Sequence, residues 1–260
     1  CYMLYAQDLE SACHEANTLT KQLASSPEPG ISDESLPSVE GRAWIRRLLA
    51  YREPVLARSL FELGVTSLAL VALWVAMWWS LSISYWLTLA ISIPAGGLMV
   101  RLFIIQHDCG HGSFFKQKFL NDSTGWILGV LTMTPYDFWK RSHSIHHATS
   151  GNLDRRGIGD ITTLTVREYL ELSPFRRFVY RLYRHPLILL GLGPAYMFLI
   201  RHRLPIGLFH MSAATWTSTM ATNLAFALFA LMMMWWIGIA PFILIHLPII
   251  VLAATYGVWL

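Results

Sequence analysis

The chain has 260 residues, of which 54% are hydrophobic and only 14% are charged. Soluble domains carry about 25% charged residues on average, so this composition argues against an ordinary soluble protein and favours a membrane protein. Eleven tryptophans and ten tyrosines agree with that class, because their amphipathic rings collect at lipid–water interfaces. Three cysteines, an odd number without metal-type spacing, give no sign of a disulfide framework, so we expect reduced thiols on a cytosolic face.

The first part of the sequence differs in composition from the rest. Residues 25–38 are rich in proline, serine and acidic side chains, which is typical of a disordered linker. We therefore predict a flexible segment over residues 1–42 and one domain over residues 43–260. Residues 43–62 are amphipathic, and two interpretations stay open: a helix on the membrane surface, and a plain helix before the first span.

Two long blocks, residues 63–100 and 204–260, contain no Asp, Glu, Lys or Arg. A membrane-spanning helix needs about 20 apolar residues, so each block has room for two. The predicted turns lie at serines 80–84 in the first block and near Gly238 and Pro241 in the second. We predict an all-α membrane protein with four spanning helices arranged as two hairpins, at about 64–81, 85–104, 212–234 and 238–258.

The remaining middle block is basic. Residues 101–203 hold fourteen Lys and Arg against seven Asp and Glu. Two hairpins leave this block on one side of the membrane, and Lys and Arg favour the cytoplasmic side. We therefore predict a cytosolic helical region here. Its apolar stretches at 126–135 and 186–200 are too short to span, so we expect them at the interface or packed beneath this region.

Half of the ten histidines fall in two clusters, each after an apolar stretch. Residues three or four apart share a helix face, so each cluster aims its imidazoles in one direction. Neutral imidazole suits Zn, Cu, Fe and Ni, and a structural zinc site takes four ligands. Five histidines exceed that number and favour more than one metal ion. The predicted ligands are His107, His111, His143, His146 and His147.

The other histidines are weaker candidates. We expect His14, His185 and His202 at the surface, and His210 and His246 packed among apolar side chains of the second long block.

Both clusters lie in longer stretches that resemble the membrane fatty-acid desaturase superfamily, whose members carry three histidine boxes around a di-iron centre. The first box reads HDCGH at 107–111 and continues with GSF, which is similar to the acyl-lipid desaturases of the omega-6 (delta-12) and omega-3 group. The second box ends the stretch 135–147, PYDFWKRSHSIHH, which is similar to the same group. Ser144 stands where plant members usually carry Arg, and the run GNLDRRG at 151–157 resembles bacterial relatives more closely.

The resemblance covers roughly residues 40–260 and implies an integral enzyme of the bacterial inner membrane. It implies oxygen-dependent insertion of a cis double bond into a fatty acyl lipid, with two iron ions, O₂ and an electron donor such as ferredoxin or cytochrome b5. No nucleic-acid partner is expected. Asp108 and Asp154 are candidates to orient the imidazoles, and Tyr136 and Trp139 are candidates for an acyl channel, although packing roles are equally compatible with the sequence.

Two alternatives stay open: a lipid or carotenoid hydroxylase or ketolase with the same boxes, and a non-catalytic metal-binding membrane protein. The double-bond position, the acyl chain length and the acyl carrier do not follow from the sequence. The third box, another H-x-x-H-H that follows the fourth span in the family, is absent before Leu260. We therefore expect a C-terminally truncated chain that is inactive by itself.

Overall fold

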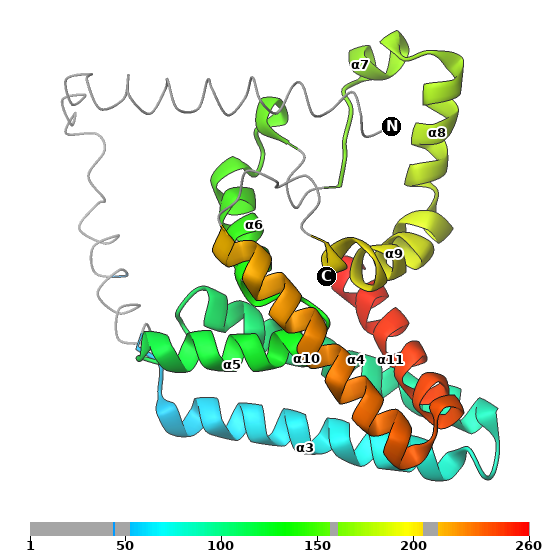
Figure 1. Ribbon diagram of the computed structural model, residues 1–260. Helices are drawn as coiled ribbons and strands as arrows, with labels where there is room; N and C mark the ends of the chain where they lie inside the picture. The colour runs from blue at the N-terminus through cyan, green and yellow to red at the C-terminus, as the bar shows by residue number, and fades with distance from the viewer. Residues whose placement is uncertain (1–43, 45–52, 157–160, 205–212, 260) are drawn as a thin grey trace. The chain divides into compact units, whose positions relative to one another are not determined.

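The computed structural model describes residues 44, 53–156, 161–204 and 213–259, and residues 53–260 form one compact unit. Every regular element in the described residues is helical (Figure 1), as predicted. The predicted flexible segment 1–42 lies outside the described residues. The elements are α3 (Leu56–Ser80), α4 (Tyr85–Gly110), α5 (Lys118–Leu131), α6 (Tyr136–Thr149), η2 (Leu153–Arg155), α7 (Val166–Glu171), α8 (Pro174–Arg184), η3 (Leu187–Leu192), α9 (Gly193–Leu199), η4 (Arg201–Arg203), α10 (Ala213–Ile237) and α11 (Ile239–Trp259).

Four of these helices, α3, α4, α10 and α11, are long and apolar enough to cross a membrane, with mean hydropathies of 1.7 to 2.1. The prediction of an all-α membrane protein with four spans is thereby confirmed. The first helix begins eight residues before the predicted range, and α4 continues six residues beyond it. α4 is therefore longer than the span alone requires, and its last turn carries the first histidine cluster.

The spanning helices form two hairpins, as predicted. The turn at 81–84 joins α3 to α4, and the hydroxyls of Ser80 and Thr88 hydrogen bond across it at 2.7 Å. Gly238 alone joins α10 to α11 with φ of +95°, a conformation that glycine adopts without strain. Both turns lie at the same end of the hairpins (Figure 1), so the end of α4 and the start of α10 lie at the other.

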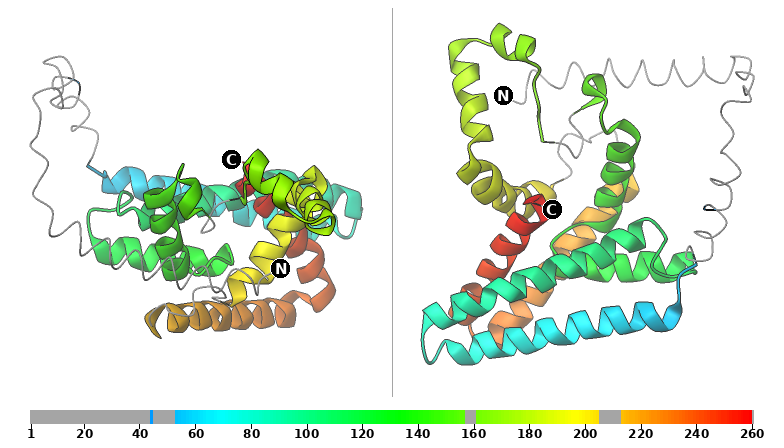
Figure 2. Two further views of the ribbon diagram at one scale, coloured as in Figure 1. Left: turned by 90° about the horizontal axis from the view of Figure 1, so that it is seen from above. Right: turned by 180° about the vertical axis from the view of Figure 1, so that it is seen from behind.

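α4 is the central helix, since it packs against α3, α5 and α11. Close contact with α11 depends on Gly96, where a Cβ would lie 2.9 Å from the Cβ of Leu252. The short helix α5 holds most of the apolar stretch 126–135 and packs against α4, α6 and α10 instead of spanning (Figures 1 and 2). The other short stretch forms η3 and α9, which pack against α11.

Candidate metal centre

The first histidine cluster occupies the last turn of α4. The backbone N–H of His111 donates to the carbonyl of His107 at 3.0 Å, so the helical pattern continues through the cluster. The two side chains are one turn apart on one helix face, and their ring centroids are 4.5 Å apart. Gly112 then redirects the chain with φ of +69°. A single helix end therefore positions both imidazoles.

The second cluster lies in the second half of α6, where the rings of His143 and His147 are 4.4 Å apart. α6 can approach the end of α4 because Gly110 has no side chain. A Cβ at Gly110 would lie 2.8 Å from Cζ3 of Trp139. This glycine therefore sets the spacing between the two clusters.

Nitrogen atoms from the two clusters converge on one point. Nε2 of His143 lies close to the Nε2 atoms of three other imidazoles: 3.0 Å from His107, 3.2 Å from His111 and 2.9 Å from His147. One ligand atom from each of these four residues lies within 4.8 Å of every other. The structure thus brings four of the five predicted ligands into one group.

Hydrogen bonding alone does not account for this convergence. Nε2 of a neutral imidazole carries either one hydrogen or one in-plane lone pair, so His143 Nε2 forms one good hydrogen bond at most. The other two nitrogen contacts then have no hydrogen bond. Two nitrogens that each lie about 2.1 Å from one metal ion are about 3.0 Å apart at right angles and about 3.4 Å apart at the tetrahedral angle. The observed spacing therefore fits ligands of a shared metal ion.

Comparison with known proteins places this chain in a family. The family model described as "Fatty acid desaturase" matches residues 84–260. The chain belongs to the fatty acid desaturase family. It is 44% identical over 218 residues to a "Fatty acid desaturase" of Bacillus subtilis (strain 168), a match that covers 83% of this chain and 60% of that protein. The prediction from the histidine boxes is confirmed at the level of the family.

Other relatives of this desaturase chain match over shorter stretches. An "sn-1 acyl-lipid omega-3 desaturase (ferredoxin)" of Synechocystis is 48% identical over 59 residues, which are 23% of this chain and 16% of that protein. An "Oleate hydroxylase FAH12" of Claviceps purpurea is 44% identical over 64 residues, or 25% and 13% of the two chains. The chain therefore spans at most about 60% of the length of these curated relatives. No solved structure matches it.

His146, the fifth predicted ligand, lies beside the converging group and is not a member of it. Its ring centroid is 6.0 Å from that of His143 and 5.9 Å from that of His147. The three-residue spacing on α6 turns His146 to one side, whereas the four-residue spacing keeps the other two imidazoles together.

Two neighbouring side chains contact imidazoles of the converging group and orient them. Nδ1 of His107 is 3.2 Å from a carboxylate oxygen of Asp108, which leaves Nε2 for the converging group. The indole of Trp139 stacks on His143, with ring centroids 4.6 Å apart and planes 17° apart. Asp154, the other candidate for orienting an imidazole, lies in η2, where its backbone N–H donates to Asn152. Of the two aspartates, Asp108 is thus the one that lies beside a predicted ligand.

The site favours neutral imidazoles. Burial, followed by the neighbouring imidazoles, lowers the pKa of His143 to about 4. Burial and the rings of His107 and His147 also lower the pKa of His111 below its ordinary value. Both rings are therefore neutral at neutral pH, which is the form whose lone pair binds a metal ion.

A buried polar clamp fixes the turn between α5 and α6 against α4. Gln106, fully buried, donates from Nε2 to the carbonyl of Thr134 at 3.1 Å and accepts from the hydroxyl of Thr132 at 2.7 Å. Gln106 directly precedes the first cluster, and the turn directly precedes α6. The clamp therefore links the positions of the two histidine clusters.

A second contact holds the same turn from the side of α10. Arg203 donates from Nη2 to the carbonyl of Met133 and from Nη1 to Asn223 Oδ1 at 3.0 Å. Asn223 donates in return to the carbonyl of Arg203 at 2.7 Å. Met133 has φ of +55°, an unusual conformation for a residue with a side chain, and these bonds stabilise it. Neither set of contacts was predicted from the sequence, where the only signal was a polar residue within an apolar stretch, Gln106 in one case and Asn223 in the other.

The structure also places most of the other predicted side chains. His185 is exposed, and His246 stacks on Phe242 at 5.1 Å, both in line with prediction. His202 is half-buried, whereas we expected it at the surface: its ring packs against Phe198 at 4.9 Å, and its Nδ1 is buried without a hydrogen bond to any residue that the structure describes. Phe138 of α6 also contacts this ring, and a count of charges does not reveal such contacts.

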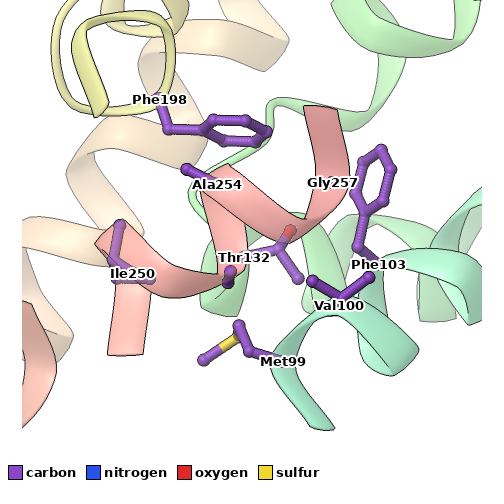
Figure 3. A pocket seen from close by; sticks show the side chains of 9 residues that line it. Met99, Val100, Phe103, Thr132, Phe198, Ile250, Ala254 and Gly257 are labelled. Atoms are coloured by element: carbon purple, nitrogen blue, oxygen red, sulfur yellow. The ribbon is translucent and has the colours of Figure 1, made fainter. Parts of the chain in front are cut away.

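A small apolar cavity lies between α4, α9 and α11 (Figure 3), lined by residues that include Met99, Phe198 and Ala254. Phe103 lines this cavity and also contacts Trp139, with ring centroids 5.4 Å apart. Phe103 and Trp139 therefore form a series of ring contacts that joins the lining of the cavity to His143. Tyr136, the other residue predicted for an acyl channel, packs against Gly125 and lies outside the cavity lining.

Proposed function

We propose that this chain supplies metal ligands for an oxygen-dependent desaturase that inserts a cis double bond into the acyl chain of a membrane lipid. The observation that carries the proposal is the convergence of four imidazole nitrogens at the end of a membrane-spanning helix, in a chain of this family. Two iron ions bound there would use O₂ and electrons from an outside donor to remove two hydrogens from neighbouring methylenes. The proposed ligands are His107, His111, His143, His146 and His147.

In this proposal, the side chains of the protein bind the metal ions and position the acyl chain. The rigid ends of α4 and α6 hold the imidazoles, and Asp108 fixes the ring of His107. Phe103 and Trp139 form an apolar wall between the cavity and the ligands, which suits the methylene groups of an acyl chain and excludes water. Catalysis by such a site depends on holding the acyl chain in the reactive position. No acid or base from the protein is required at the substrate.

The proposal includes a location and a donor. The basic block 101–203 favours the cytoplasmic side of the inner membrane for the histidines, and a relative whose name includes ferredoxin favours an acidic electron-carrier protein. Two reporter enzymes, one active only in the cytoplasm and one active only in the periplasm, are each fused after Thr149 to test the location. Activity of the cytoplasmic reporter supports the proposed side, and activity of the periplasmic reporter contradicts it.

Metal content tests the site without requiring turnover. The purified chain, reconstituted anaerobically with ferrous iron and washed, should retain iron that the His143→Ala variant loses. The matched control is His185→Ala, which changes an exposed imidazole far along the chain. One zinc per chain with no retained iron favours the non-catalytic metal-binding alternative.

A chimera tests the reaction. The 218 aligned residues of this chain replace their counterparts in the Bacillus subtilis relative, and the fatty acids of a host that lacks its product are analysed by mass spectrometry. New double bonds that disappear with His143→Ala support a desaturase. A hydroxylated acyl chain without a new double bond favours the second candidate function, an acyl hydroxylase. The match to an oleate hydroxylase is the observation that supports this candidate.

A further inference from the structure

α8 presents an unpartnered apolar stripe. At 100° per residue, Phe175, Phe178 and Leu182 fall within about 60° of one another on the helix surface. Their exposed fractions are 74%, 56% and 49%. Large apolar side chains this exposed along one helix stripe mark a surface that another apolar phase covers.

The direction of the stripe is fixed by the rest of the chain. Tyr183 accepts a hydrogen bond from the backbone N–H of Thr162 at 3.1 Å, and Tyr180 accepts one from that of Leu164 at 3.2 Å. On the ideal helix, Tyr180 lies nearly opposite the stripe and Tyr183 lies about 105° from it. They hold α8 against residues 161–165 and prevent it from turning its apolar side chains inward.

The charges on α8 match an anionic surface. On the ideal helix, Arg181 lies about 90° to one side of the stripe, Arg176 lies about 130° to the other side, and Arg184 lies about 150° away. None of these three forms an ion pair with any described residue, whereas Arg177 is occupied by the carbonyls of Leu170 and Leu172. The sequence from residue 172 to residue 260 contains six arginines and no acidic residue.

α8 lies close to one end of a membrane-spanning helix, where it can contact the surface of a bilayer. α8 packs on η3, and η3 and α9 pack on the spanning helix α11. Phe198 of α9 meets Ala254 and Gly257 in the last turns of α11 (Figure 3), which is the end opposite the α10–α11 turn. In Figure 1 and the right-hand view of Figure 2, α8 lies at the edge of the unit, apart from the four spanning helices. α8 is thus tethered beside the end of α11 that lies toward the histidine clusters.

We propose that α8 lies on the bilayer surface on the side of the histidine clusters, with its stripe among the acyl chains and Arg176 and Arg181 on the phosphates of anionic lipids. A basic amphipathic helix with Phe and Leu on its apolar side has the composition of helices that bind this interface. Long arginine side chains that flank the stripe reach the headgroups while their methylenes stay in apolar surroundings. This inference is independent of the metal centre and of the proposed reaction.

Spin labels on the full chain test the orientation of α8. In a background with Cys1→Ser and Cys13→Ser, a label is attached at Phe178→Cys or, as the matched control, at Arg184→Cys. Cys109 is buried, and its residual labelling is measured in the background alone. In vesicles of equal parts phosphatidylglycerol and phosphatidylcholine, the label at 178 should collide more with oxygen and the label at 184 more with a water-soluble nickel chelate. Equal access of both labels to nickel overturns the proposal.

The same label tests the headgroup contacts and the rival occupants. Each arginine near an anionic surface contributes roughly a factor of five to surface binding, so Arg176→Gln with Arg181→Gln should weaken it about thirtyfold and return the label at 178 to water. A label that stays equally deep in the double variant, or in pure zwitterionic phosphatidylcholine, contradicts the role of the anionic headgroups. A label that leaves water only when ferredoxin is added, or only at high protein density, instead identifies a protein-docking or self-association surface and overturns the proposal.

Discussion

Replacement of Gln106 by leucine tests whether the buried clamp sets the geometry of the metal centre. Leucine keeps a similar volume but leaves the carbonyl of Thr134 and the hydroxyl of Thr132 without their partners, which bond to the glutamine at 3.1 and 2.7 Å. Each buried polar group left unsatisfied costs about 1–3 kcal/mol, so the two groups together should cost the variant about 2–6 kcal/mol of stability. For a chain of this size that loss lowers Tm by roughly 4–24 °C.

The assay is thermal unfolding in detergent, followed by iron retention at a temperature where the variant is still folded. The variant should retain less iron, because the turn that precedes α6 loses its link to the helix that carries the first cluster. The matched control is Gln117→Leu, since Gln117 is exposed and should change neither quantity. The double variant Gln106→Leu with Thr132→Val removes one orphaned group and should recover part of the lost stability. A Gln106→Leu chain with unchanged Tm and full iron retention refutes the clamp.

Three further predictions concern the same region. His143→Ala should abolish iron retention, whereas His146→Ala should reduce it less, because His146 lies outside the converging group; equal losses in metal analysis contradict this. Gly110→Ala should destabilise the chain by about 1–3 kcal/mol through overlap with the indole it contacts, whereas Gly97→Ala, with nothing within 4 Å, should be neutral in thermal unfolding. Burial, together with the adjacent arginines, lowers the pKa of His202 to about 3, whereas the ordinary value in an unfolded chain is 6.5. Between these two pH values the unfolded state binds more protons than the folded state, so the stability of the folded state falls as the pH falls. Between pH 7 and pH 5 the loss should be about 2 kcal/mol, and a His202→Gln variant with the same pH dependence of Tm as the parent would exclude this origin.

The number of spanning helices and the pairing of the histidines followed from the sequence because each depends on local patterns. An uncharged block that is long enough for two spans predicts a pair of membrane-spanning helices. In the second block, Gly238 indicated the turn between them. His107 and His111 were assigned to one face because a four-residue spacing on a helix fixes it. These are properties of single segments.

Features that depend on contacts between segments were not accessible from the sequence. The approach of α6 to α4 depends on Gly110 facing Trp139, and no pattern within either segment records that pairing. The partial burial of His202 depends on ring contacts with Phe138 of α6 and Phe198 of α9. In the sequence, Gln106 is a single polar residue in an apolar run, and its role depends on its hydrogen-bond partners in the distant turn at 132–134.

α4 is a continuous helix of 26 residues from Tyr85 to Gly110, so its length is about 39 Å against a hydrocarbon thickness of about 30 Å. The imidazoles of His107 and His111 therefore stand at a height above the lipid that depends on how far α4 tilts. A tilt of about 30° shortens the vertical reach of the helix by about 5 Å, which is the length of roughly four methylene groups. In the proposed function, bilayer thickness, through the tilt of this one helix, therefore determines how far an acyl chain must rise from the membrane to meet the proposed ligands.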